Sequence, residues 1–74
     1  MLEKIIQIIA SRSGVPTSAL TEETNILDLD IDSLDIINMI MDVEYSFNVR
    51  FEDDEIIEIR TAKDIEETIL KKFK

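Results

Sequence analysis

Apolar residues recur at helical spacing in three stretches of this chain. The first predicts an amphipathic helix over residues 1–12, because four apolar side chains repeat three or four positions apart before Gly14 and Pro16. The third predicts a last helix that begins near Thr61, where Thr61 and Asp64 have the spacing of a capping box. The apolar stripe of this last helix consists of Ala62, Ile65, Ile69, Leu70 and Phe73.

The central stretch predicts a helix over residues 33–47 that carries two apolar stripes. Asp32 is a good N-cap, Asp35 adds a capping-box-like partner and a favourable charge, and Asn48 can end the helix. One stripe consists of Ile36, Ile40, Val43 and Phe47, with Met39 beside it. The second consists of Leu34, Ile37 and Met41. A helix at the surface of a small domain normally hides one stripe, so we expect the second to remain exposed for a partner.

Two segments between the helices lack helical periodicity. Residues 13–31 have isolated apolar residues among Thr and Ser, and we expect a long loop that these apolar side chains pin across the helices. Residues 47–51 alternate apolar positions but have no partner strand, so we expect an extended connector. The acidic run Glu52–Glu55 precedes three isoleucines, which predicts that a short helix starts there.

These elements predict an all-α fold, a small four-helix bundle with a short third helix and a long loop between the first two helices. The 74 residues form a single domain, 1–74, close to the size at which one core is only marginally sufficient. Such a chain cannot enclose a large active-site cavity. It has no Cys and no His, which excludes a thiolate nucleophile, a zinc–thiolate site and a Ser-His-Asp triad within the chain. We therefore do not expect an enzyme.

The charge distribution is strongly asymmetric. The net charge of −9 argues against binding to nucleic acid or a stable association with membranes. Residues 13–59 contain thirteen acids and one base, Arg50, whereas five of the eight basic residues lie in residues 60–74. An acidic surface can simply maintain solubility, but its coincidence with the second apolar stripe favours the docking of basic partners. We see no signal peptide or membrane span and expect a cytoplasmic monomer.

The acidic residues do not form a metal site that the sequence can specify. Asp28, Asp30 and Asp32 alternate like the first ligands of an EF-hand loop, but Ser33 occupies the glycine position and Met39 the position of the bidentate glutamate. Close pairs of carboxylates are unavoidable with seventeen acids in 74 residues, so a catalytic pair is not indicated. We predict no metal site.

The segment from Asp28 to Asp35 reads Asp-Leu-Asp-Ile-Asp-Ser-Leu-Asp and leads into the acidic, two-striped helix. This arrangement resembles the acyl carrier protein family. The resemblance covers nearly the whole chain and includes the Phe47-x-Val49 exit, the acidic Glu52–Glu55 turn and the Thr61-Ala62-x-Asp64-Ile65 helix start. Two departures are Asp30, where the family usually has glycine, and Arg50 in the connector. Both hint at a specialised carrier rather than the housekeeping carrier of fatty acid synthesis.

The resemblance implies that Ser33, flanked by Asp32 and Leu34, carries 4′-phosphopantetheine derived from coenzyme A. The protein would then hold acyl intermediates as thioesters and deliver them to enzymes of fatty acid, polyketide or lipid biosynthesis. The implied partners are a phosphopantetheinyl transferase (holo-ACP synthase) and acyl-transferring or acyl-processing enzymes with basic docking patches. In that setting Leu34, Ile37 and Met41 form the apolar docking patch.

The resemblance also implies roles for two further groups of residues, one in docking and one in holding the acyl chain. The acids expected to meet basic residues of partners are Asp35, Asp42 and Glu44. A long acyl chain would slip between the second and third helices, in a cavity lined by Ile36, Ile40, Val43, Ile56 and Ile59. The plain alternative is that these five residues are ordinary core.

Two other functions remain open from the sequence. A peptidyl or aminoacyl carrier shares the fold and the arm, but its helix after the serine is usually less acidic. An acidic helical interaction module would use the same surface with no modification of Ser33.

Overall fold

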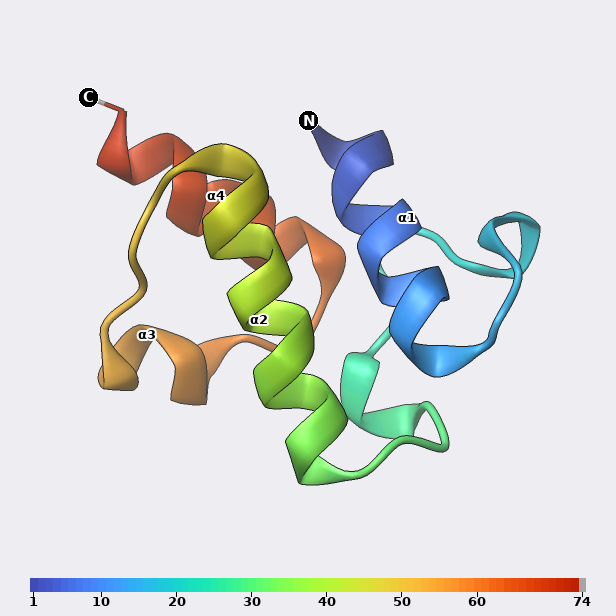
Figure 1. Cartoon of the computed structure of the whole chain (residues 1–74). Coiled ribbons are helices and arrows are strands. Elements are labelled where there is room, and N and C mark those ends of the chain that lie inside the picture. The colour runs from blue at the N-terminus through green and yellow to red at the C-terminus, as the bar shows by residue number, and fades with distance from the viewer. Residues whose placement is uncertain (74) are drawn as a thin grey trace.

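The computed structural model describes residues 1–73 and places four α-helices in that part of the chain. The helices are α1 (Leu2–Ser13), α2 (Ser33–Phe47), α3 (Asp53–Glu58) and α4 (Ala62–Lys72), and two 3₁₀ turns, η1 (Thr17–Ala19) and η2 (Ile26–Asp28), lie in the first loop. Figure 1 shows α2 through the middle, with α1 on one side and α3 on the other. The expected all-α bundle with one short helix is confirmed.

The core forms where α1, α2 and α4 face one another. Each of these helices buries three apolar side chains, and the loops add four more. The buried residues are Ile5, Ile8, Ile9, Leu20, Ile26, Met39, Ile40, Val43, Phe51, Ile59, Ala62, Ile65 and Ile69. α3 buries no residue fully, so three helices form the core and the short one covers its edge.

The long loop between α1 and α2 is tied to the segment that precedes α4. Gly14 ends α1 in the left-handed region, with φ 77°, and donates its N–H to the carbonyl of Ala10 at 2.9 Å. Further on, Ile26 is buried and its N–H donates to the carbonyl of Arg60 at 2.7 Å. Leu20 is also buried, but Leu27 is exposed, so not every apolar residue of the loop pins it as expected.

The short helix α3 makes polar contacts near both of its ends, and Ile56 packs against the core. The Glu52 N–H donates to Glu55 Oε1 at 2.8 Å, and Lys72 of α4 donates to the same oxygen at 2.7 Å. At the other end, the Arg60 guanidinium donates to the carbonyls of Ile57 and Ile59. Glu52 is the N-cap of this helix and the other three acids of the run form its first turn, where negative charge is favourable, as predicted.

The start of α4 has the predicted capping box. Thr61 Oγ1 accepts from the Asp64 N–H at 3.2 Å, and Asp64 Oδ2 accepts from the Thr61 N–H at 3.2 Å. A cap of this kind contributes about 1 kcal/mol to helix stability. The capping box fixes the first residue of α4. Ala62, Ile65 and Ile69 then lie on the one face of the helix that is buried in the core.

Candidate functional site

Ser33 is the first residue of α2 and its side chain is exposed. The preceding residue, Asp32, is extended, and its Oδ1 accepts from the Asp35 N–H at 2.9 Å. The N–H groups of Ser33 and Leu34 have no acceptor within residues 1–73. The serine hydroxyl therefore lies beside two free amide donors at the positive end of a helix.

The cap of α2 is simpler than the sequence suggested. Asp32 supplies its half of the interaction, but within residues 1–73 Asp35 makes no return hydrogen bond to the backbone of Asp32. The pKa of the Arg12 guanidinium on α1 is raised mainly by its hydrogen bond to Asp42, and the Asp35 carboxylate adds a smaller favourable charge. The expected reciprocal box is therefore wrong, and the Asp32 carboxylate alone caps α2.

Asp30, which departs from the usual glycine of the family, occupies a tight turn. The Ile31 N–H donates to the carbonyl of Leu29 at 2.8 Å, which places Asp30 at the apex. Among residues 1–73, Asn48 is the only non-glycine residue with positive φ, so Asp30 occupies this turn without left-handed strain. Asp30 is exposed and adds a carboxylate near Ser33.

The second apolar stripe of α2 is exposed, as predicted. The exposed fractions are 65% for Leu34, 52% for Ile37 and 55% for Met41. Tyr45, four residues after Met41, is 91% exposed and continues the same face. Sequence reasoning missed Tyr45, although its i+4 spacing from Met41 was visible. We refer below to Leu34, Ile37, Met41 and Tyr45 as the α2 stripe.

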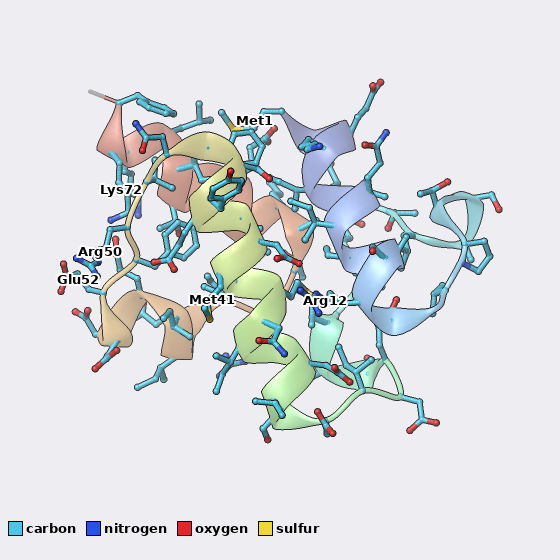
Figure 2. The ribbon with its side chains drawn as sticks, viewed as in Figure 1. Met1, Arg12, Met41, Arg50, Glu52 and Lys72 are labelled. Atoms are coloured by element: carbon cyan, nitrogen blue, oxygen red, sulfur yellow. The ribbon has the colours of Figure 1, made fainter. Side chains whose placement is uncertain are left out.

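Two of the three expected docking acids have partners inside the molecule. Asp42 accepts two hydrogen bonds from the Arg12 guanidinium, and these bonds lower the pKa of the Asp42 carboxyl. Glu44 Oε2 accepts from the Phe51 N–H at 2.8 Å and so anchors the connector. Figure 2 shows Arg12 and Met41 on opposite sides of α2, so the Asp42 pair lies beside α1.

The five residues expected around an acyl chain lie together in or against the core. Ile40, Val43 and Ile59 are buried, whereas Ile36 and Ile56 are half-buried and pack against the core. Three hollows are found at the surface of residues 1–73, and only one of them touches this cluster, through Ile59. One, of about 300 Å³, is lined by Lys4, Gln7, Ile8, Ser11, Asp42, Tyr45 and Ser46 between α1 and α2. Another, of about 190 Å³, is lined by Glu55, Glu58, Ile59, Asp64, Glu67, Thr68 and Lys71 between α3 and α4.

Two further features of residues 1–73 bear on the site, namely the grouping of possible metal ligands and the apolarity of the helices. In that part of the chain, no three or more His, Cys, Asp or Glu side chains are arranged to hold a metal ion. None of its helices combines the length and apolarity needed to cross a membrane.

Comparison with known proteins assigns the chain to a family. The family described as "Phosphopantetheine attachment site" matches residues 3–69. The acyl carrier protein of Syntrophobacter fumaroxidans is 40% identical over 72 residues, which cover 96% of this chain and 89% of that protein. The acyl carrier protein of Thermotoga maritima is 38% identical over 74 residues, covering 99% and 91% of the two chains. That of Rubrobacter xylanophilus is 38% identical over 65 residues, covering 86% and 80%.

The chain therefore belongs to the family of carriers with a phosphopantetheine attachment site. Within that family it is one of the acyl carrier proteins. These proteins carry acyl groups on 4′-phosphopantetheine, act as carriers rather than enzymes, and interact with a phosphopantetheinyl transferase and acyl-processing enzymes. The function and cofactor predicted from the sequence are confirmed at this level.

Proposed function

We propose that Ser33 is the residue that carries 4′-phosphopantetheine. The observation that carries this proposal is the exposed Ser33 side chain at the start of α2, beside the unpaired N–H groups of Ser33 and Leu34. A phosphodiester requires an accessible hydroxyl, and free amides at a helix N-terminus favour a phosphate group by about 0.3–1 kcal/mol. The residues present thus fit the group.

The other serines are less suitable for the same physical reasons. Ser11 and Ser46 lie near the C-terminal ends of α1 and α2, where the helix dipole disfavours an anion. Ser13 Oγ already accepts from the Val15 N–H at 3.2 Å, and Ser18 lies in the short turn η1. Ser33 is the only serine in the first turn of an α-helix among residues 1–73.

The acidic residues around Ser33 favour exposure of the site rather than tight retention of the phosphate. Asp28, Asp30 and Asp32 are exposed, and neither salt bridge within residues 1–73 involves them. The arm ends in a thiol, which holds acyl groups as thioesters. The chain itself contains no Cys and no His, so it has no thiol or imidazole that could attack such a thioester.

We propose that the α2 stripe meets apolar surface on the partner enzymes and that Asp35 meets their basic residues. Leu34 and Asp35 lie within two residues of Ser33, so contacts with them align the attachment site. Asp42 and Glu44, already engaged by Arg12 and the Phe51 N–H, contribute less to docking than the sequence suggested.

We further propose that a long acyl chain enters between α2 and α3. Ile36 and Ile56 are half-buried at this edge, with Ile40, Val43 and Ile59 buried beyond them. Because α3 buries no residue fully, moving it exposes less apolar surface than moving any of the three long helices would. Ordinary core packing remains the alternative for these residues.

Intact mass after incubation with coenzyme A and a phosphopantetheinyl transferase tests the attachment site. The parent should gain one phosphopantetheine, and Ser33→Ala should gain none while keeping its helical circular dichroism, because Asp32 still caps α2. Ser46→Ala is the matched control and should be modified like the parent. Modification of Ser33→Ala would overturn the assignment, and an unmodified parent would favour the interaction module.

A further inference from the structure

Tyr45 extends the exposed apolar surface of α2 well beyond Ser33. It is 91% exposed, the most exposed of the large hydrophobic side chains in residues 1–73. From Leu34 to Tyr45 the α2 stripe runs about 16 Å along the helix axis. An isolated exposed aromatic side chain needs no explanation, but four consecutive members of one helical face form a continuous patch, as in helices that dock into grooves.

Charge is distributed unevenly along this face. At the Ser33 end, Asp28, Asp30 and Asp32 carry exposed carboxylates that take part in no salt bridge within residues 1–73. In the other half of α2, the Arg12 guanidinium neutralises Asp42, and Glu44 accepts from the Phe51 N–H. Unpaired negative charge therefore accumulates near Ser33 and is partly compensated toward Tyr45.

A hollow lies directly beside Tyr45. It measures about 300 Å³, is bordered by Tyr45 and Ser46 of α2, and continues onto Lys4 and Gln7 of α1. A side chain that packs on one face of the tyrosine ring can enter this space. Contacts around Tyr45 can thus extend from α2 onto α1, which increases the area that a partner can cover.

We infer that Tyr45 is an anchor for partner enzymes, which hold α2 in a groove that is basic near Ser33 and apolar near Tyr45. This inference rests on the proposed role of α2 in docking. The unpaired carboxylates near Ser33 require basic residues at that end of the groove. At the other end, the exposed ring of Tyr45 requires an apolar surface. Tyrosine buries a large area at low conformational cost, and it is enriched among residues that dominate binding. Two chemically different ends give the helix a single orientation and so position the Ser33 hydroxyl.

The experiment compares kcat/KM for modification by a phosphopantetheinyl transferase with coenzyme A. Tyr45→Ala should lower kcat/KM roughly tenfold through a higher KM, as expected for a dominant interface residue, and should leave the melting temperature unchanged because the side chain is exposed. Tyr45→Phe should stay within about twofold of the parent, because the ring supplies the contact area. Phe73→Ala, at an exposed aromatic residue outside α2, is the matched control and should also stay within about twofold.

The salt dependence of kcat/KM distinguishes the apolar contribution of Tyr45 from the electrostatic contribution of the acids near Ser33. The loss caused by Tyr45→Ala should persist at high salt, whereas the loss caused by Asp35→Asn should shrink, since only the latter is electrostatic. If Tyr45→Ala is modified as fast as the parent, or no slower than Phe73→Ala, the anchor is refuted and the attachment site at Ser33 still stands. A parent that is never modified would instead refute the proposed function itself.

Discussion

Arg12, near the end of α1, forms a two-pronged ion pair with Asp42 in the middle of α2. Nε lies 2.7 Å from Oδ2 and Nη2 lies 3.2 Å from Oδ1. Both side chains are more than a third exposed, so the pair adds little to the free energy of unfolding. Its larger effect is on the surface, since it cancels the charge of one of the three acids expected to attract partners.

This ion pair predicts that Asp42 is masked toward partners. Asp42→Asn alone should change kcat/KM for transferase modification by less than about twofold. In an Arg12→Gln background, where Asp42 is released, the same change should slow modification at low salt. A double-mutant cycle on kcat/KM measures this coupling. If Asp42→Asn in the parent slows modification as much as Asp35→Asn does, Arg12 does not mask the carboxylate.

The contacts of Glu55 predict a loss of stability in acid. The hydrogen bond from the Glu52 N–H and that from Lys72 hold the pKa of the Glu55 carboxyl below its usual range. A lowered pKa in the folded state means that the unfolded state binds more protons, so this contribution is complete above the ordinary glutamate pKa of about 4.3. The contribution of Glu55 to stability is lost as the pH falls through the lower pKa that its carboxyl has in the folded state.

Melting temperatures of the parent and Glu55→Gln, followed from neutral pH into acid, test this linkage. The parent should be the more stable at neutral pH, and the gap should close below about pH 4. Glu23→Gln is the control, because the Glu23 carboxylate forms no ion pair within residues 1–73. A gap that stays constant with pH would show that Glu55 gains nothing from its charged form.

The two stripes of α2 should respond oppositely to truncation. Ile37→Ala and Met41→Ala should cost less than about 1 kcal/mol, since both side chains are more than half exposed. Ile40→Ala should cost roughly 2–5 kcal/mol, because it leaves a cavity between buried side chains. Urea unfolding gives the free energies. An equal cost at Ile37 and Ile40 would mean that α2 is enclosed on both sides.

Replacement of Gly14 should destabilise the fold because its backbone conformation disfavours residues with a Cβ. Its φ of 77° lies in the left-handed region, and a Cβ placed there would meet nothing within 4 Å. Gly14→Ala should therefore destabilise by about 1–2 kcal/mol from strain alone, with no steric clash. Gly14→Asn should cost less, because asparagine tolerates this conformation, as Asn48 does at the end of α2 with φ 53°. Thermal melting of the two variants makes the comparison, and equal losses would contradict it.

Salt should stabilise the fold. Thirteen acids against one base in residues 13–59, and a net charge of −9, produce repulsion that counter-ions screen. The melting temperature should rise with sodium chloride and with millimolar divalent cations. A melting temperature insensitive to both would indicate that the carboxylates are already compensated within the fold.

Local chemistry was enough to place the helices and their ends. The caps at Asp32, Asn48 and Thr61 and the stop at Gly14 follow from interactions within a few residues, and the structure contains all four. The exposure of the second stripe was also predictable, because 3.6-residue periodicity separates it from the buried one. The family could be named from the segment around Ser33 for the same reason, since its motif is contiguous.

Tertiary packing decided which charges remain available on the surface. Arg12 and Asp42 are 30 positions apart, and Lys72 and Glu55 are 17 apart, so these contacts depend on which helix faces lie side by side. The number of acids in α2 could be counted in advance, but not that Asp42 is paired and Glu44 holds the connector. Side-chain reach across a helix interface is set by the packing of the core, and periodicity along one chain does not specify it.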